Sequence, residues 1–232
     1  MSLYNIAVLI SGSGTNLQAV IDAVENGEIK NAKVALVLSS RDTAYGLQRA
    51  EKHGIPNMAI DRNNSAGLLK TLEDYNINGI VLAGYLTILS PDVIKKYGGS
   101  IINIHPALLP LFGGKGFYGI KVHQAVLASG VKYTGATAHI VDYGVDTGAA
   151  LVREVIPTLS DDTAESLQKR VLAIEHNVLI LAVKALVEGR VNELAKNPIL
   201  LVNDNDREGI LEYAKGLLEL GSVLTAADSE GL

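Results

Sequence analysis

Two side chains suited to acid–base chemistry stand close together near the middle of the chain, in the segment Asn-Ile-His-Pro-Ala-Leu-Leu-Pro that begins at Asn103. One residue separates Asn103 from His105, so on a strand both point to the same face, about 6–7 Å apart at Cα. An amide donor beside an imidazole can stabilise a developing oxyanion and move a proton. A single histidine at a strand end more often has a structural role, but the pair and the glycine- and proline-rich stretch after it favour catalysis.

A second polar segment, Thr137 to Gly148, carries two carboxylates and a further same-face pair, Thr137 and His139. A carboxylate beside an imidazole raises the pKa of that imidazole and fixes the orientation of its ring. Taken alone, the segment also fits an acidic hairpin loop in which Asp and Gly serve as turn residues.

A glycine-rich loop, Ser-Gly-Ser-Gly-Thr-Asn at Ser11, lies between a predicted strand and a predicted helix. Glycines let backbone N–H groups approach a phosphate, and a helix N-terminus adds partial positive charge. Leu17 stands where a dinucleotide fingerprint has its third glycine, and no acidic residue ends the second strand. The loop therefore fits either a single phosphomonoester or a plain turn.

Short β-branched runs alternate with helical patterns over the first hundred residues, which predicts a parallel sheet covered by helices. The expected strands are Ile6–Ile10, Lys33–Ser39, Asn57–Ile60, Gly79–Ala83 and Ser100–Ile104, and the expected helices are Thr15–Glu25, Tyr45–His53, Leu68–Tyr75 and one opening at Ser90-Pro91. Apolar runs without alternation, such as Val34–Leu38, predict strands that are buried on both faces.

The pattern changes in the second half of the chain. A short helix is expected at Ile120–Ser129, followed by two alternating runs, Thr134–Val141 and Ala150–Ile156, that predict antiparallel strands. A long helix near Thr163–Glu188 follows, with Asp161 or Asp162 as its cap. The fold class is therefore α/β: an open, mostly parallel, twisted Rossmann-like sheet with helices on both faces and antiparallel strands at its C-terminal side.

The composition excludes several classes of protein. The 232 residues are 48% hydrophobic and 19% charged, which excludes a disordered or coiled-coil chain. A net charge of −5 argues against a nucleic-acid partner. The chain has no cysteine, so disulfides and thiolate metal sites are excluded. No apolar stretch approaches the roughly 20 residues of a membrane span. We expect a cytoplasmic protein without a membrane or metal partner.

The three polar segments, in this order and spacing, resemble the phosphoribosylglycinamide formyltransferases of purine biosynthesis. The resemblance rests on the loop at Ser11, the segment at Asn103 and Val-Asp-Thr-Gly at Val145, and it covers about Asn5 to Leu194. The His-Pro-x-Leu-Leu-Pro stretch marks the wider superfamily of folate-dependent formyl transfer, and the glycine loop narrows it to the nucleotide enzymes.

The resemblance implies transfer of a formyl group from 10-formyltetrahydrofolate to the amine of glycinamide ribonucleotide, without a metal. It implies a catalytic set of Asn103, His105 and Asp146, in which Asp146 keeps His105 charged near neutral pH. The ligand residues that it implies are Gly14, Thr15, Asn16, Thr137 and Glu175 for the ribonucleotide, and Leu86, Thr87, Ile88, Leu89, Val141 and Asp142 for the folate.

Two other functions use parts of the same sequence. A formyltetrahydrofolate hydrolase would use this core with water as the acceptor, and such enzymes usually add a regulatory domain before it. A non-catalytic nucleotide-binding module would use the glycine loop alone and would not bind folate. The acidic tail gives no sign of the basic domain that a transfer-RNA formyltransferase would need.

We predict a formyltransferase domain at residues 1–195, with a nucleotide-binding half (1–100) and a catalytic and folate-binding half (101–195). Residues 196–232 would form a C-terminal appendage with a strand at Ile199–Val202, a helix at Glu208–Leu220 and a strand at Ser222–Thr225. Both a monomer and a homodimer are compatible with the sequence.

Overall fold

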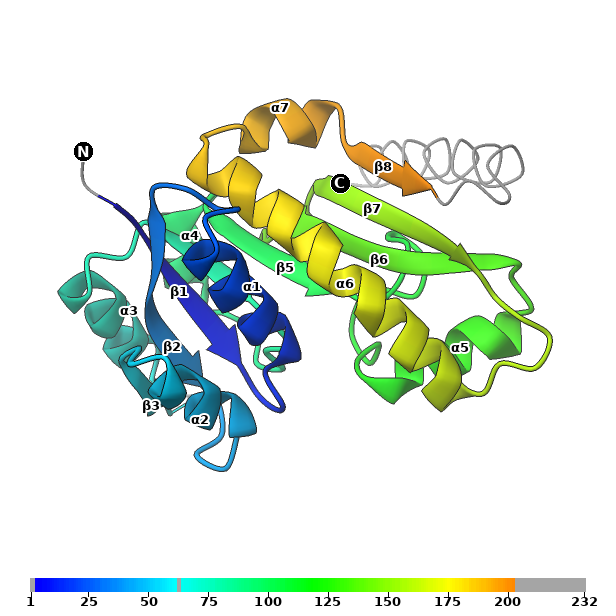
Figure 1. Cartoon of the computed structure of the whole chain (residues 1–232), viewed down its shortest axis with the longest axis horizontal. Coiled ribbons are helices and arrows are strands. Elements are labelled where there is room, and N and C mark those ends of the chain that lie inside the picture. Colours follow the sequence, from blue (N-terminus) through cyan, green and yellow to red (C-terminus); the bar gives the residue numbers. More distant parts are fainter. Residues whose placement is uncertain (1–2, 62–63, 203–232) are drawn as a thin grey trace.

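An eight-stranded sheet forms the centre of the structure, a computed structural model that describes residues 3–61 and 64–202 (Figure 1). The strands stand side by side in the order β3-β2-β1-β4-β5-β6-β7-β8. Their bounds are β1 (Tyr4–Ile10), β2 (Ala32–Ser39), β3 (Asn57–Ala59), β4 (Gly79–Leu82), β5 (Ile101–His105), β6 (Tyr133–Ile140), β7 (Ala150–Pro157) and β8 (Ile199–Val202). The helices are α1 (Thr15–Glu25), α2 (Tyr45–Lys52), α3 (Ser65–Asp74), α4 (Pro91–Tyr97), α5 (Ile120–Ser129), α6 (Ala164–Val187) and α7 (Val191–Lys196).

Strand direction follows the predicted fold class. Strands β1 to β5 run parallel to one another, and β6 runs antiparallel to both β5 and β7. The predicted antiparallel strands at the C-terminal side of the sheet are therefore confirmed, while β8 pairs with β7 in the parallel sense.

Two hydrophobic cores cover the two faces of the sheet. Strand β1 shows the division, since Ile6, Val8 and Ile10 pack into the core beneath α1, α5 and α6. The alternate residues Ala7 and Leu9 pack into the core beneath α3 and α4. Figure 1 shows α1 and α6 lying across the same face of the sheet. The central strands are thus buried on both sides, as the apolar run in β2 predicts.

The chain reverses its direction of travel across the sheet between β1 and β4. It moves outward from β1 to β2 and β3, then crosses back so that β4 lies on the other side of β1. In open α/β sheets, ligands bind beyond the carboxyl ends of the strands at such a switch point. The loops after β1 and β4 are therefore the places to look for a site.

The structure corrects one predicted detail, the cap of α6, and leaves two other predictions untested. Thr163 caps α6, with its hydroxyl accepting from Ser166 N, so the prediction of Asp161 or Asp162 as the cap is wrong. Asp162 instead pairs with Arg170. The boundary at residue 195 stays a prediction; just beyond it, β8 is joined to the sheet. The helix and strand expected after residue 202 lie outside the described residues.

Candidate active site

A cleft of about 920 Å³ opens at the carboxyl ends of β1, β4 and β5. Its walls come from residues 12–16 after β1, residues 83–89 after β4, the end of β5, the connection between β6 and β7, and one side of α6. Every residue that the sequence assigned to the site lines this cleft except Thr137. Segments far apart in the sequence are thus brought to one place.

His105 and Asp146 form the closest approach of acid and base in the cleft. The Nδ1 atom of His105 lies 3.5 Å from Oδ2 of Asp146, and its Nε2 lies 2.8 Å from the carbonyl oxygen of Phe112. A carbonyl can only accept, so Nε2 carries a hydrogen and Nδ1 is the atom that gains or loses the second proton. The ring is 4% exposed.

Burial governs the protonation of this pair. Burial lowers the pKa of His105 and outweighs the carboxylate of Asp146 and the carbonyl of Phe112, which both raise it. Burial raises the pKa of Asp146, but the neighbouring His139, His105 and Gly114 N–H outweigh it and leave the pKa below its usual value. Burial therefore opposes the effect expected of Asp146, and these directions favour a neutral His105 beside an ionised Asp146 in the free protein. That Asp146 keeps His105 charged near neutral pH stays a prediction.

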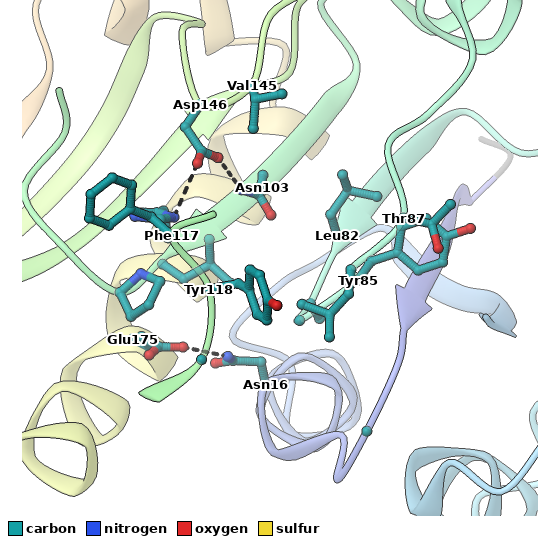
Figure 2. Close-up of a pocket in the computed structure, with 18 of the residues that line it drawn as sticks. Asn16, Leu82, Tyr85, Thr87, Asn103, Phe117, Tyr118, Val145, Asp146 and Glu175 are labelled. Atoms are coloured by element: carbon teal, nitrogen blue, oxygen red, sulfur yellow. Dashed lines mark hydrogen bonds and ion pairs between the residues drawn. The ribbon is translucent and has the colours of Figure 1, made fainter. Parts of the chain in front are cut away.

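Asn103 lies between Asp146 and a second histidine, His139. Its amide nitrogen is 3.0 Å from Nε2 of His139 and 3.4 Å from Oδ1 of Asp146. Nδ1 of His139 donates to the carbonyl oxygen of Ile140, at 2.8 Å, so Nε2 can accept from the amide. Figure 2 shows the amide oxygen of Asn103 on the side away from Asp146. The hydrogen bond from the Asn103 amide to Asp146 is the longer of the two. A substrate oxygen can therefore take the place of Asp146 as its acceptor.

The backbone of Asp146 is held in an unusual conformation. Its φ is 60°, a left-handed value that few residues other than glycine adopt. The carboxylate accepts a hydrogen bond from Gly114 N at 2.9 Å, which joins the loop after β5 to the connection between β6 and β7. Asp142, in the same connection, accepts from Gly144 N and from the Thr147 hydroxyl and so orders the turn.

Thr137 lies beneath the cleft, not in its wall. Its fully buried hydroxyl donates to the carbonyl oxygen of Ala107 and accepts from Leu109 N. Both bonds fix the Pro-Ala-Leu-Leu-Pro loop that follows His105. Its contribution to the site is therefore to position that loop, and contact with a substrate stays an untested prediction.

Asn16 and Glu175 meet at the other end of the cleft, although they are 159 positions apart in the sequence. Nδ2 of Asn16 donates to Oε2 of Glu175 at 2.7 Å, as Figure 2 shows. Burial raises the pKa of Glu175, and the bond from Asn16 only partly opposes this. Oδ1 of Asn16 is buried without a partner. A buried carboxylate with an unsatisfied amide oxygen beside it suits a ligand that brings N–H groups.

The glycine loop has a structural constraint that the sequence does not reveal. Gly14 is the N-cap of α1 with φ +71°, and a Cβ there would lie 2.7 Å from Cα of Gly46 in α2. Gly14 is therefore required for close packing against α2. A Cβ on Gly12 would meet nothing within 4 Å, and Gly12 lines the cleft. Gly14 lines the cleft as well, and its predicted contact with the ribonucleotide stays a prediction.

The side of the cleft assigned to the folate is apolar and open. Leu86 and Ile88 are 52% and 69% exposed in the loop after β4, and Tyr118 and Tyr143 are exposed near the opposite rim. Leu89 is buried and anchors the end of the loop in the core beneath α3 and α4. Large exposed apolar side chains around a cleft are typical of a site for a flat organic ligand.

Sequence reasoning missed two histidines of the cleft as site residues. His139 was noticed only as the partner of Thr137 on the same face of β6. His123 lies in the first turn of α5, 1% exposed, and burial together with nearby His105 lowers its pKa to about 4. Its position in the cleft depends on how α5 packs, so no local sequence pattern could indicate it.

The described part of the chain has neither a cluster suited to a metal nor a membrane-spanning helix. Among residues 3–61 and 64–202, no group of three His, Asp or Glu side chains is placed to hold a metal ion. None of the helices in these residues combines the length and the apolar character that a bilayer span requires.

Comparison with known proteins shows similarity to formyltransferases. The sequence model of the formyl transferase family matches residues 4–183. The chain is 38% identical over 192 residues to the phosphoribosylglycinamide formyltransferase of Haemophilus influenzae, which covers 80% of this chain and 88% of that protein. It is 39% identical over 193 residues, 80% of this chain, to the chloroplastic phosphoribosylglycinamide formyltransferase of Vigna unguiculata, of which it spans only 62%.

A solved structure gives the same result. The crystal structure of glycinamide ribonucleotide transformylase 1 from Symbiobacterium toebii superposes with a TM-score of 0.76 at 37% identity, over 81% of this chain and 89% of that one. The sequence and the fold of the chain thus lead to the same family in both kinds of comparison. The chain belongs to the formyl transferase family, among the phosphoribosylglycinamide formyltransferases.

Proposed function

We propose that the protein transfers a formyl group from 10-formyltetrahydrofolate to the amine of glycinamide ribonucleotide in purine biosynthesis. The observation that carries the proposal is the joint placement of Asn103, His105 and Asp146 in one cleft. That cleft has a glycine loop and a buried carboxylate at one end and an open apolar rim at the other. An anionic nucleotide bearing an amine suits the first end, and a flat pterin suits the second.

The reaction needs one bond to form, one to break and one proton to move. The amine nitrogen attacks the formyl carbon, and the bond from that carbon to the folate nitrogen breaks. The amide of Asn103 donates to the developing oxyanion in place of its 3.4 Å bond to Asp146. Neutral His105 takes the amine proton at Nδ1 and returns it to the leaving nitrogen. Asp146 stabilises the imidazolium while it lasts.

The direct test is to incubate the protein with both substrates. We expect equimolar formation of tetrahydrofolate, followed by absorbance, and of formylated ribonucleotide, followed by mass spectrometry. Tetrahydrofolate released without formylated nucleotide would indicate a hydrolase with water as the acceptor. Binding of the nucleotide with no affinity for folate would instead identify a non-catalytic module.

The glycine loop offers a paired test of phosphate binding. We expect Gly12→Ala to change the free energy of unfolding by less than about 0.5 kcal/mol but to raise the KM for the ribonucleotide. We expect Gly14→Ala to lower the free energy of unfolding by about 2 kcal/mol, because its φ is left-handed and its Cβ would overlap the backbone of Gly46. Thermal unfolding and steady-state kinetics measure the two effects. An unchanged ribonucleotide KM in Gly12→Ala would contradict a close approach of the phosphate to the backbone at Gly12.

Glu175→Gln should make the fold more stable at neutral pH and weaken binding of the ribonucleotide. The folded pKa of Glu175 lies above its unfolded value, so the wild-type protein loses stability as pH rises through that interval. Gln removes the charge, keeps an acceptor for Asn16 and should raise the melting temperature by a few degrees at pH 7.5, with little difference at pH 4. The ribonucleotide KM should rise roughly 10- to 100-fold, because a charged hydrogen bond to the amine is lost. A lower melting temperature at pH 7.5 would contradict the prediction.

The wider setting follows from the same proposal. The partners are the two small substrates, without nucleic acid or membrane, and without a metal. We expect a monomer or homodimer in the cytoplasm, and gel filtration with light scattering measures the oligomeric state.

A further inference from the structure

The hydroxyl of Ser11, at the start of the glycine loop, bonds to the segments that follow β2 and β4. Ser11 follows β1 directly and is 3% exposed. Its Oγ lies 2.7 Å from Oγ of Ser40, the residue after β2, and accepts a hydrogen bond from Leu86 N at 2.9 Å. One buried side chain therefore contacts the segments that follow both neighbours of β1 in the sheet.

Ser11 opens the glycine loop but does not line the cleft, whereas the next five residues do. Its hydroxyl faces the loop after β4, which is assigned to the folate. A hydroxyl has one hydrogen and two lone pairs, so Ser11 accepts from Leu86 and still bonds with Ser40. The residue thus belongs to the nucleotide loop by sequence and to the folate loop by contact.

The loop after β4 needs such a support. Residues 84–89 are neither helix nor strand, and Leu86 and Ile88 expose large apolar side chains. Its start is held by the bond from Ala83 N to Leu9 O, and its end by the burial of Leu89. The bond from Leu86 N to Ser11 holds the middle of the loop, between these two anchors.

We propose that Ser11 is a positioning residue for the folate substrate, acting through the backbone of Leu86, and not a ligand of the nucleotide phosphate. This inference rests on the proposed function. Without the hydroxyl, Leu86 N loses its acceptor in a partly buried place, and the loop has more freedom before folate binds. The cost then appears in folate binding and not in binding of the phosphate.

The test compares Ser11→Ala with Ser40→Ala. Both remove one hydroxyl of the same pair, but only Ser11→Ala removes the acceptor of Leu86 N. We expect Ser11→Ala to raise the KM for 10-formyltetrahydrofolate and the Kd for tetrahydrofolate about 3- to 10-fold, the range of one hydrogen bond. The ribonucleotide KM and kcat should stay within about twofold of wild type, and Ser40→Ala should match wild type in every constant.

Amide hydrogen exchange gives a readout that needs no substrate. Exchange in a peptide covering residues 84–89 should be faster in Ser11→Ala and unchanged in Ser40→Ala. The proposal is overturned if the folate constants of Ser11→Ala are unchanged, if only its ribonucleotide KM rises, or if Ser40→Ala has the same effect. A wild-type protein that transfers no formyl group would overturn the proposed function instead, and the exchange rates would still decide whether Ser11 holds the loop.

Discussion

Asp146→Asn is expected to lower kcat by about 10³-fold while leaving the fold and both KM values close to wild type. Asn keeps an oxygen that accepts from Gly114 N, and Asn is among the residues that tolerate the left-handed φ of 60°. The substitution therefore removes the charge without removing the loop geometry. Stopped-flow or steady-state formyl transfer measures the rate, and circular dichroism checks the fold.

The pH dependence of the same variant tests the direction of proton transfer. His105 must be neutral to accept the amine proton, so kcat/KM should fall at acid pH with an apparent pKa below 6.5. The charge of Asp146 raises the pKa of His105, so its removal should move the acid limb to still lower pH. A shift to higher pH would contradict the proposed proton transfer.

The effects of substituting His105 and Asp146 on kcat should not multiply in the double variant. We expect His105→Ala to lower kcat as strongly as Asp146→Asn, and the double variant to be little worse than either alone, because the two groups handle one proton. Asp92→Asn, an exposed carboxylate in the first turn of α4, is the matched control. Multiplied effects in the double variant, or unfolding of His105→Ala, would favour separate or purely structural roles.

Asn103→Ala is expected to lower kcat by about 10²- to 10³-fold, the usual loss when one oxyanion donor is removed. The amide nitrogen of Asn103 already donates to His139 and to Asp146. Only its 3.4 Å bond to Asp146 is weak enough for the oxyanion to replace. Binding of tetrahydrofolate, measured by calorimetry, should change little. Near-normal turnover would remove Asn103 from the transition state.

Local patterns were enough to predict much of the fold and the three polar segments of the cleft, whereas the other site residues came from the family resemblance. Apolar runs such as Val34–Leu38 and the alternating residues of β6 and β7 indicated the strands. A strand buried on both faces is apolar throughout, and a strand with one buried face alternates apolar and polar residues. The same-face pair Asn103 and His105 followed from strand geometry alone. Both residues line the cleft at the end of β5.

What the sequence could not predict depends on packing between distant elements. The bond between Asn16 and Glu175 exists because α6 crosses the sheet beside α1. The low pKa of His105 depends on how completely the cleft buries the ring, which no neighbour in sequence determines. The resemblance implies Thr137 as a ligand, and the sequence could not show that the loop after β5 uses both bonds of its hydroxyl, to Ala107 and Leu109.

The pairing of β8 with β7 bears on how this domain can be cut from the chain. A strand at the border of a sheet offers a row of unpaired N–H and C=O groups, which invites other chains to add themselves. β8 covers that row on β7, although it lies beyond the last residue of the site. A fragment ended at residue 195 would leave the eight-residue β7 as the border strand and favour self-association, whereas one ended after Val202 has the four-residue β8 there, and a short border strand invites less pairing.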